Sequence, residues 1–467
     1  MKTQRRTPFA FAALLWAVLT LSGCFREDFS TDPNDRLTFS ADSIKFDTIF
    51  TQKGTATYSF QVYNRNKKAL NITSVRLRNG AAGFYINVDG LPGPDVQDIE
   101  ISGKDSLTVF VKADVDPTGQ DEPVKIEDDI LFTVNGIDQR VVLQAYGQDA
   151  VLLRGETLTT DTEFTPEKPY LIYDSLVVAP EATLTLTPGV RLHFHNKAEL
   201  KVRGTLQAGG SSDRPVTLRG DRLDNMFPTL PYDFLAGQWG GIHFYSESYD
   251  NRLDHVSMRG SSYGILADSS DIGRPKIELS NSVIHNSAGT LFSAADSRIK
   301  AWNCQFSNAG NALLELSGCE AEFTHCTIVN YYQFSWIRSA MLVFDRYDSE
   351  APDTEKRQLT FRNCLIAGSC ALMQPENIQE TTIRFYHTLF TVAGSDDDNF
   401  ISSTWEGNPD FKSTGDNYQF DFRIGPNSSA IGAGSPEYVD ERLRTDLSGT
   451  PRPDGENPDA GAYQALP

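Results

Sequence analysis

Three cysteines recur at one position of a repeated segment, and a histidine precedes one of them. They are Cys304, Cys326 and Cys364, with His325 directly before Cys326. A thiol beside an imidazole can act as a nucleophile, and thiols combined with an imidazole also suit zinc. His387 would supply the imidazole of such a zinc site. Whether either chemistry is available depends on how the segments that carry these residues stack.

One segment occurs in four ungapped copies, and the cysteines lie in the last three of them: IELSNSVIHN, IKAWNCQFSN, AEFTHCTIVN and LTFRNCLIAG, which begin at residues 277, 299, 321 and 359. Two looser copies begin at 252 and 382. The position before the cysteine then falls at 255, 281, 303, 325, 363 and 386, in steps of 26, 22, 22, 38 and 23. Such a period predicts a solenoid. The long step predicts about sixteen extra residues that loop out between Asn330 and Leu359.

Apolar residues alternate within each copy and change phase at the asparagine or histidine, which predicts two strands joined by a bend. The cysteines then point inward as small apolar side chains. Parallel strands lie about 4.8 Å apart, so the first and third sulfur would be near 10 Å apart, too far for one zinc ion. We therefore expect buried thiols, with His325 at the bend pointing elsewhere. Disulfide pairing of neighbouring cysteines stays open.

Two further stretches resemble known β-helix proteins. The text LVVAPEATLTLTPGVRLHFHNKAELKVRGTLQAGG from Leu176 resembles the opening coils of right-handed parallel β-helices. The text GNPDFKSTGDNYQFDFRIGPNSSAIGAGS with the later DLSGTPRPDGENPDAGAYQ resembles the carboxy-terminal segment of bacterial β-helix surface proteins, which caps the solenoid. The resemblance implies an all-β fold with a right-handed parallel β-helix of roughly ten coils over residues 150–395 and a capping segment over 396–467. Asn286, Asn308 and Asn330 should stack at one turn, with their amides bonded along the solenoid.

The region before this solenoid has a different pattern. Residues 36–148 contain about seven short alternating strands and no helical stretch, which predicts an immunoglobulin-like β-sandwich. Asn135-Gly136 between two such runs predicts a tight hairpin. Residues 24–35 are polar and are expected to form a flexible tether.

The amino terminus predicts secretion and lipidation. Positive residues precede a short apolar run that ends at Leu21, so residues 1–23 are expected to be a signal peptide. Leu21-Ser22-Gly23-Cys24 resembles the bacterial lipobox, which implies a lipid on Cys24 and a membrane attachment through that lipid alone. The alternative is a plain secretory signal. Glu27-Asp28 is similar to the surface-export signal of Bacteroidetes lipoproteins, so we expect the outer membrane and the cell surface, with a periplasm-facing orientation as the alternative.

The net charge of −20 disfavours nucleic acid and anionic membranes as partners. It also disfavours a polyanionic substrate, unless calcium intervenes. The run from Asp396 to Asp398 is a candidate calcium ligand set or a solvated loop; otherwise no cofactor or metal is expected. His193 and His195 form a candidate metal pair without an evident third ligand.

Catalytic signatures of β-helix enzymes are incomplete in the sequence. Arg298-Ile299-Lys300 resembles one signature of the polygalacturonases, but their paired-aspartate and Gly-His-Gly signatures are absent. Asp254-His255 resembles part of a pectate-lyase motif without its flanking residues. In the outward column Glu278, Lys300 and Glu322 alternate in sign, which is typical of a solvated charge ladder. No catalytic residue is therefore predicted.

The densest aromatic stretch follows Asn330. Aromatic faces with nearby hydrogen-bonding side chains are typical of sugar-binding and protein-binding surfaces. The alternative is that they seal the insertion against the coils. We predict that the protein binds glycans or a protein partner without catalysis; the alternative is a polysaccharide lyase or glycoside hydrolase on the same scaffold. The candidate binding residues are Tyr331, Tyr332, Phe334, Trp336, Arg338 and Tyr347.

Overall fold

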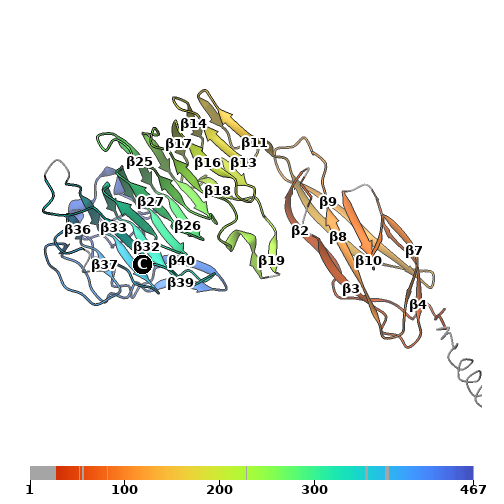
Figure 1. Ribbon diagram of the computed structural model, residues 1–467. Helices are drawn as coiled ribbons and strands as arrows, with labels where there is room; N and C mark the ends of the chain where they lie inside the picture. Colours follow the sequence, from red (N-terminus) through yellow and green to blue (C-terminus); the bar gives the residue numbers. More distant parts are fainter. Residues whose placement is uncertain are drawn as a thin grey trace, which may run out of the picture. The chain divides into compact units, whose positions relative to one another are not determined.

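The structure is a computed structural model that describes residues 28–51, 53–54, 57–80, 83–227, 229–352, 356–373 and 378–465. It is all-β, and its described helices are three 3-10 turns (Figure 1). The chain divides into two compact units: the first ends at Gly147, and the second begins at Gln148 and includes residues Thr118–Pro123. The predicted signal peptide and Cys24 lie outside the described residues.

The first unit contains two five-stranded antiparallel sheets, in the orders β1-β3-β8-β5-β6 and β2-β10-β9-β4-β7. Their alternating apolar residues share one buried core. The hairpin predicted at Asn135-Gly136 is confirmed: it joins β9 to β10, and both residues have the positive φ that such a turn requires. The immunoglobulin-like topology stays a prediction. The strands are β1 (Thr38–Phe39), β2 (Ser43–Phe50), β3 (Tyr58–Tyr63), β4 (Leu70–Leu77), β5 (Phe84–Val88), β6 (Leu91–Pro92), β7 (Asp95–Ile101), β8 (Ser106–Ala113), β9 (Val124–Val134) and β10 (Ile137–Gln148).

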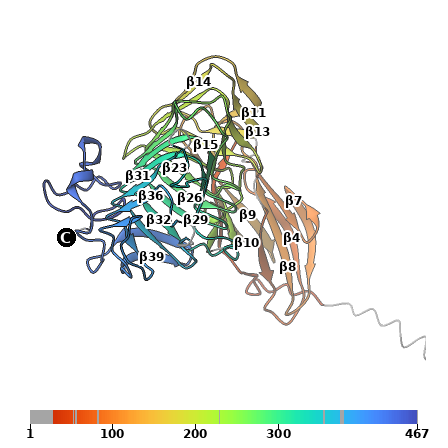
Figure 2. The same ribbon diagram turned by 60° about the vertical axis from the view of Figure 1, so that its left-hand side comes forward.

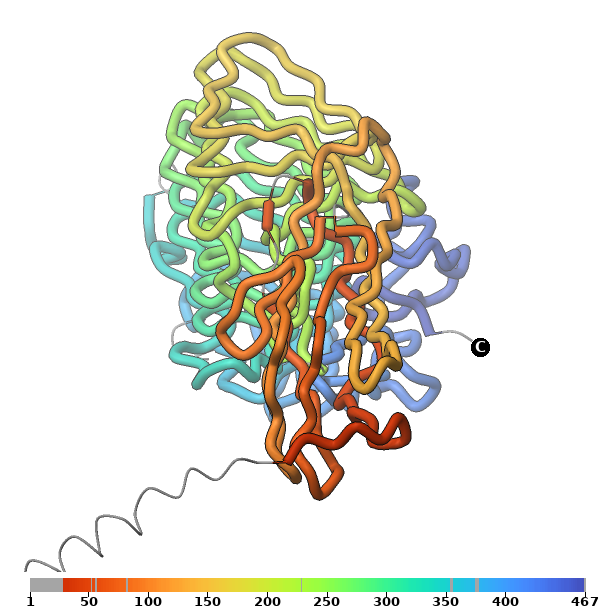
Figure 3. Tube along the Cα trace, turned by 90° about the vertical axis from the view of Figure 1, so that its right-hand side faces the viewer, coloured from red at the N-terminus to blue at the C-terminus, as the bar shows by residue number. Residues whose placement is uncertain are grey.

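The second unit is built on two long parallel sheets of sixteen and ten strands, consistent with a β-helix-like fold. Its coils stack in chain order from yellow through green to blue (Figure 3). The larger sheet bends at β13, whose first half pairs with β15 and whose second half pairs with β16. Each regular coil therefore contributes three strands, such as β25, β26 and β27. The right-handed sense stays a prediction.

The elements of the second unit are β11 (Val151–Leu158), β12 (Thr162–Phe164), β13 (Tyr170–Val178), β14 (Thr183–Leu186), β15 (Arg191–Phe194), β16 (Glu199–Val202), β17 (Thr205–Gly209), β18 (Val216–Gly220), β19 (Asn225–Phe227), β20 (Leu230–Pro231), η1 (Tyr232–Phe234), β21 (Ile242–Phe244), β22 (Asn251–Asp254), β23 (Val256–Arg259), β24 (Ile265–Ala267), β25 (Pro275–Ser280), β26 (Val283–Ser287), β27 (Phe292–Ala295), β28 (Arg298–Trp302), β29 (Gln305–Ala309), β30 (Leu314–Ser317), β31 (Glu320–Thr324), β32 (Thr327–Asn330), β33 (Leu342–Asp345), β34 (Leu359–Arg362), β35 (Leu365–Gly368), β36 (Ile383–Tyr386), β37 (Leu389–Phe390), β38 (Phe400–Ile401), β39 (Phe411–Asp416), β40 (Gln419–Ile424), η3 (Pro436–Tyr438) and η4 (Glu441–Leu443).

The bend between the first two strands of a coil is a single residue in the left-handed region. Six such residues form a column: His255, Asn281, Asn303, His325, Asn363 and His387, all with φ between 48° and 53°. Asparagine and histidine tolerate this conformation better than most residues, which explains the repeated residue types. The predicted alignment of the last copy was wrong by one residue. Tyr386 pairs with Arg362, so His387 continues this bend column and does not follow the cysteines.

The long step between copies is not a single loop. Residues 342–345 form β33, which pairs with β30 and continues the third face of the coil. The extra residues are therefore split between two loops, one over residues 331–341 before β33 and one after it, of which the structure describes residues 346–352 and 356–358. The predicted extra residues do lie between Asn330 and Leu359, and β33 interrupts them because Leu342 and Phe344 retain the alternation that a strand of this face requires.

The interior of the coils is filled by apolar side chains, including a column of stacked phenylalanines. Phe323, Phe361, Phe385 and Phe400 lie nearly parallel, with successive ring centroids 5.0, 4.7 and 5.1 Å apart. Such offset stacks add to the energy of burial. The three repeated cysteines lie in the same interior and are fully buried.

Candidate functional site

His325 and Cys326 do not form a joint site. The Cys326 thiol points into the core, where it approaches the carbonyls of Thr324 and Ala301. The imidazole of His325 lies on the other side of the bend: its Nδ1 donates to the Gly461 carbonyl at 3.2 Å, and its Nε2 accepts from Asn363 at 2.9 Å. Burial lowers the pKa of His325 well below its ordinary value, so the ring is neutral and structural.

The remaining cysteines are also structural. All five described cysteines are free thiols, and four of them are buried. Burial raises the pKa of the Cys326 and Cys364 thiols well above the ordinary value and that of Cys319 to about 11, which opposes nucleophilic chemistry. Among the described residues there is no group of three or more His, Cys, Asp or Glu that could hold a metal ion.

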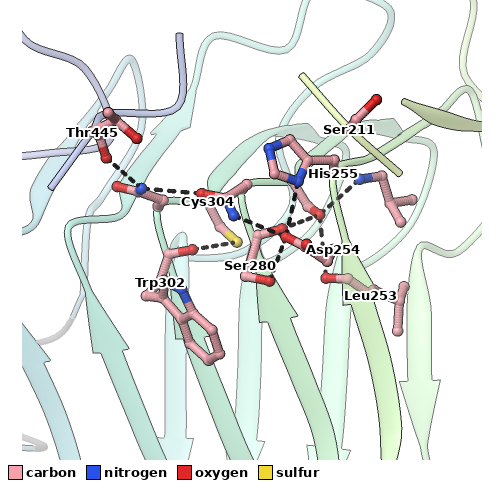
Figure 4. A network of polar contacts seen from close by, with 12 residues as sticks. Ser211, Leu253, Asp254, His255, Ser280, Trp302, Cys304 and Thr445 are labelled. Atoms are coloured by element: carbon pink, nitrogen blue, oxygen red, sulfur yellow. Dashed lines mark hydrogen bonds and ion pairs between the residues drawn. The ribbon is translucent and has the colours of Figure 1, made fainter. Parts of the chain in front are cut away.

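The bend column is the surface on which the segment after the coils docks. Asn363 donates to the Ser435 carbonyl and accepts from its amide, both at 2.8 Å. Asn303 donates to the Thr445 carbonyl at 2.8 Å, and Figure 4 shows Thr445 beside the column, near Cys304 and Trp302. Residues 435–445 therefore run along the ends of β28, β31 and β34. Figure 2 shows this blue segment beside β31 and β36.

A second face is sealed by the same carboxy-terminal region. Phe422, Ile424 and Tyr463 pack on outward apolar residues of β32, β35 and β37. The predicted turn stack of Asn286, Asn308 and Asn330 exists, but its amides bond to backbone groups of neighbouring coils rather than to one another. The buried backbone at this turn needs partners, and the amides supply them.

Two adjoining cavities form a groove on the outer face of the ten-stranded sheet. The larger, about 430 Å³, lies over the first halves of β25, β28, β31 and β34. The smaller, about 340 Å³, lies over the second halves of β28, β31 and β34 and is closed by the segment containing η3 and η4. Both cavities share Lys300, Glu322 and Arg362. We refer to the two together as the sheet groove.

The sheet groove carries charges of both signs, and most of them are paired. Arg362 pairs with Glu322, and Arg252 reaches Glu278 at 3.4 Å. The segment that contains η3 and η4 forms one wall of the smaller cavity, which we call the wall. There two guanidinium nitrogens of Arg442 bind the Asp440 carboxylate. Within the described part of the chain, the Lys300 ammonium has no ion pair, although it lies between Glu278 and Glu322 in the outward column. The groove thus offers fixed donors and acceptors, with the Lys300 ammonium at its centre, and Arg298 in the lining of its larger cavity also has no ion pair among the described residues.

Two cation–π contacts fasten the wall to the sheet. The guanidinium carbon of Arg442 lies 4.7 Å from the Trp302 ring centroid, and that of Arg362 lies 5.4 Å from the Tyr438 centroid. Trp302 is consequently 9% exposed although it points outward from β28. These contacts place aromatic and guanidinium surfaces at the end of the groove.

The first loop of the insertion mostly seals the carboxy-terminal hairpin against the coils. Tyr331 packs against Phe422, and Phe334 stacks on Tyr418 with ring centroids 5.2 Å apart. Tyr332 is buried.

The remaining predicted binding residues lie in both loops. Trp336 is 92% exposed, while Arg338 is fastened to Asn311 and to the Ala288 carbonyl. Tyr347 lies in the second loop, is buried, and accepts from the Cys319 amide at 3.0 Å. The structure therefore does not bring the six residues together, and binding at the exposed pair Trp336 and Arg338 stays a prediction.

Other candidates from the sequence have structural partners. The Asp254 carboxylate accepts from Ser280 and Asn281 and lies 3.0 Å from the His255 ring (Figure 4). Burial alone would raise the pKa of Asp254, but these neighbours hold it below its usual value. This is the bonding of a structural carboxylate.

The two candidate metal sets are engaged in the same way. His195 pairs with Asp221 at 2.7 Å, and His193 is buried in β15, which ends just before His195. Asp396 and Asp397 accept backbone amides of their own loop.

Comparisons with known proteins provide no family. No family model and no curated protein matches the chain. Two solved structures are similar to parts of the chain. One is a family 123 glycoside hydrolase from Clostridium perfringens, described for glycolipid glycan hydrolysis, with 6% identity over 26% of this chain and 30% of that chain and a TM-score of 0.19. The other is the VesB protease of Vibrio cholerae, with 14% identity over 25% of this chain and 33% of that chain and a TM-score of 0.18. The chain spans about a third of each.

Proposed function

We propose that this chain is a lipid-anchored protein of the outer membrane, displayed at the cell surface, whose parallel-sheet unit binds glycans without catalysis. The supporting observation is the sheet groove, a long polar depression with aromatic and paired charged side chains at its end. Sugars present many hydroxyl groups on an apolar ring face, and fixed donors and acceptors beside aromatic rings match both. No cofactor and no nucleic acid takes part. Among described residues no helix is long and apolar enough to cross a membrane.

A glycoside hydrolase is the second candidate, because Glu278 and Glu322 lie two strands apart on one face. This register places their backbones about 9.6 Å apart. In inverting glycosidases the two catalytic carboxyl groups are separated by up to about 9.5 Å, which is a similar distance. A hydrolase of that class needs one protonated carboxyl group as acid. Both carboxylates here are ion-paired with arginines, which favours the binding role.

The test is to incubate the chain with xylan, galactomannan, amylose, polygalacturonate and chondroitin sulfate, with EDTA or with calcium. Retardation in polysaccharide gels measures binding, and new reducing ends and ultraviolet absorbance measure hydrolysis and elimination. We expect retardation without products, abolished by Lys300→Ala together with Thr360→Trp, which removes the central cation and fills the larger cavity. Lys201→Ala, on another outward face, is the matched control. Products that disappear in Glu322→Gln would establish the enzyme instead.

A further inference from the structure

The direction of the sheet groove follows from which halves of the strands line it. The larger cavity is lined by Pro275, Arg298 and Glu320, near the starts of β25, β28 and β31. The smaller cavity is lined by Trp302 and Thr324, at the ends of β28 and β31. The two cavities therefore follow one another along the strands and across the coil, toward the bend column, and together they cover four neighbouring strands.

The groove is closed where it reaches the bend. Glu437, Tyr438, Asp440 and Arg442 line the smaller cavity and are absent from the lining of the larger one. This wall is fastened at both ends, by Ser435 on Asn363 and by Thr445 on Asn303.

Contacts in the middle of the wall also hold it in place. The side chains of Asp440 and Ser435 cap the short turns η4 and η3 by accepting from the amides of Arg442 and Glu437. Arg442 in turn lies on Trp302. The wall is held by two residues of the bend column, Asn363 and Asn303, and by a cation–π contact. It is therefore a fixed part of the surface rather than a loose loop.

From this geometry we infer that the sheet groove recognises the end of a glycan chain and not its interior. The inference rests on the proposed function and adds to it the part of the glycan that binds. An extended chain that enters over Glu320 and runs along the strands meets the wall after Trp302, so its terminal sugar lies in the smaller cavity. There Lys300, Glu322 and Arg362 from the sheet and Glu437 from the wall offer hydrogen bonds to terminal hydroxyl groups.

The experiment asks whether the amount of bound protein follows the number of glycan chain ends or the total mass of glycan. The full chain, kept in mild detergent, is titrated onto beads that carry equal masses of xylan, galactomannan, amylose, polygalacturonate or chondroitin sulfate, each intact or partly depolymerised. The saturating amount of bound protein should rise by the factor by which the mean chain length falls. An unchanged capacity per unit mass would overturn chain-end recognition while leaving glycan binding intact. Retention on none of the preparations would overturn both.

Opening the wall gives an independent measurement. The double variant Tyr438→Gly and Arg442→Gly removes the two wall side chains that reach Arg362 and Trp302, and should raise the capacity on intact polymers toward that on fragments. Arg423→Gly, in the carboxy-terminal hairpin, removes the same type of arginine–aspartate pair without touching the groove. If the double variant is folded by circular dichroism and its binding capacity still rises only with the number of glycan chain ends, the role assigned to the wall is contradicted.

Discussion

Arg442 covers the outward face of Trp302, with its guanidinium carbon 4.7 Å from the ring centroid. These residues come from segments that are far apart in sequence, one from β28 and one from η4. The contact does two things at once: it buries an indole that would otherwise face solvent, and it fixes the wall of the sheet groove. An arginine on an indole contributes about 0.5–1 kcal/mol when exposed and more when desolvated.

Substituting Arg442 by alanine should therefore expose Trp302. We expect stronger quenching of tryptophan fluorescence by acrylamide and a loss of stability on the order of 1 kcal/mol. A Trp336→Phe background removes the signal of the fully exposed ring. Arg423→Ala, which breaks an equivalent pair with Asp421, should leave the quenching unchanged. Equal quenching in the Arg442 variant would show that the wall does not cover the indole.

Asn363 should be a determinant of docking for residues 435–445. Replacing it by alanine leaves the Ser435 backbone groups without partners, at about 1–3 kcal/mol, and places alanine at φ 50°, at about 1 kcal/mol. Trypsin should then cut faster at Arg442 and Arg444. Asn281→Ala has the same backbone strain at φ 48° but no bond to this segment, so its tryptic pattern should not change.

Buried neutral histidines should make stability depend on pH. Burial lowers the pKa of His285 to about 4 and that of His193 to about 3. The unfolded chain protonates these rings first, so their stabilising effect is complete above about pH 6.5 and is lost as pH falls toward the folded-state values. Each ring costs about 1.4 kcal/mol per pH unit in that interval.

The variant His285→Gln tests this dependence by urea unfolding between pH 7 and pH 4. Its unfolding free energy should fall less steeply than that of the unmodified chain, because one titrating ring is removed. Carboxylates titrate in both proteins, so the difference isolates His285. Parallel curves over the whole interval would show that the pKa of His285 is the same in the folded and the unfolded chain.

The thiols of the coil interior should be unreactive in the folded protein. In a Cys24→Ser background, a disulfide reagent at pH 8 should modify none of the buried cysteines and should react slowly with half-buried Cys370, whose pKa burial raises to about 11. All five thiols should react in guanidinium. Fast modification that persists in Cys370→Ser would mean that the coils open locally.

Local patterns in the sequence predicted the strands and most of the register. Alternation and the repeated asparagine or histidine located the bend at Asn281, Asn303, His325 and Asn363, because these residue types tolerate its left-handed conformation. The last copy was misaligned because Tyr386 and His387 are both polar aromatic residues. The inward pair Ile383 and Phe385 would have given the correct register.

The sheet groove was not predictable in the same way. Its floor was visible as the alternating charges of Glu278, Lys300 and Glu322, and a face of that kind is usually solvated. What turns it into a groove is a wall whose residues follow after more than a hundred others, and no local pattern relates Arg442 to Trp302. The same docking over a long sequence distance brings the aromatic residues Tyr331 and Phe334, which were predicted to bind ligands, into contact with the hairpin of β39 and β40.

The bond between Asn303 and Thr445 joins residues 142 positions apart, which has a consequence for the order of assembly. The coil that carries Trp302 contains all of its strands without residues 435–445, so it can stack before its wall docks. Until Thr445 docks, the protein presents an open channel with an uncovered indole. A chain interrupted between Ile401 and Ser435 would therefore retain stacked coils but display a different surface from the finished molecule.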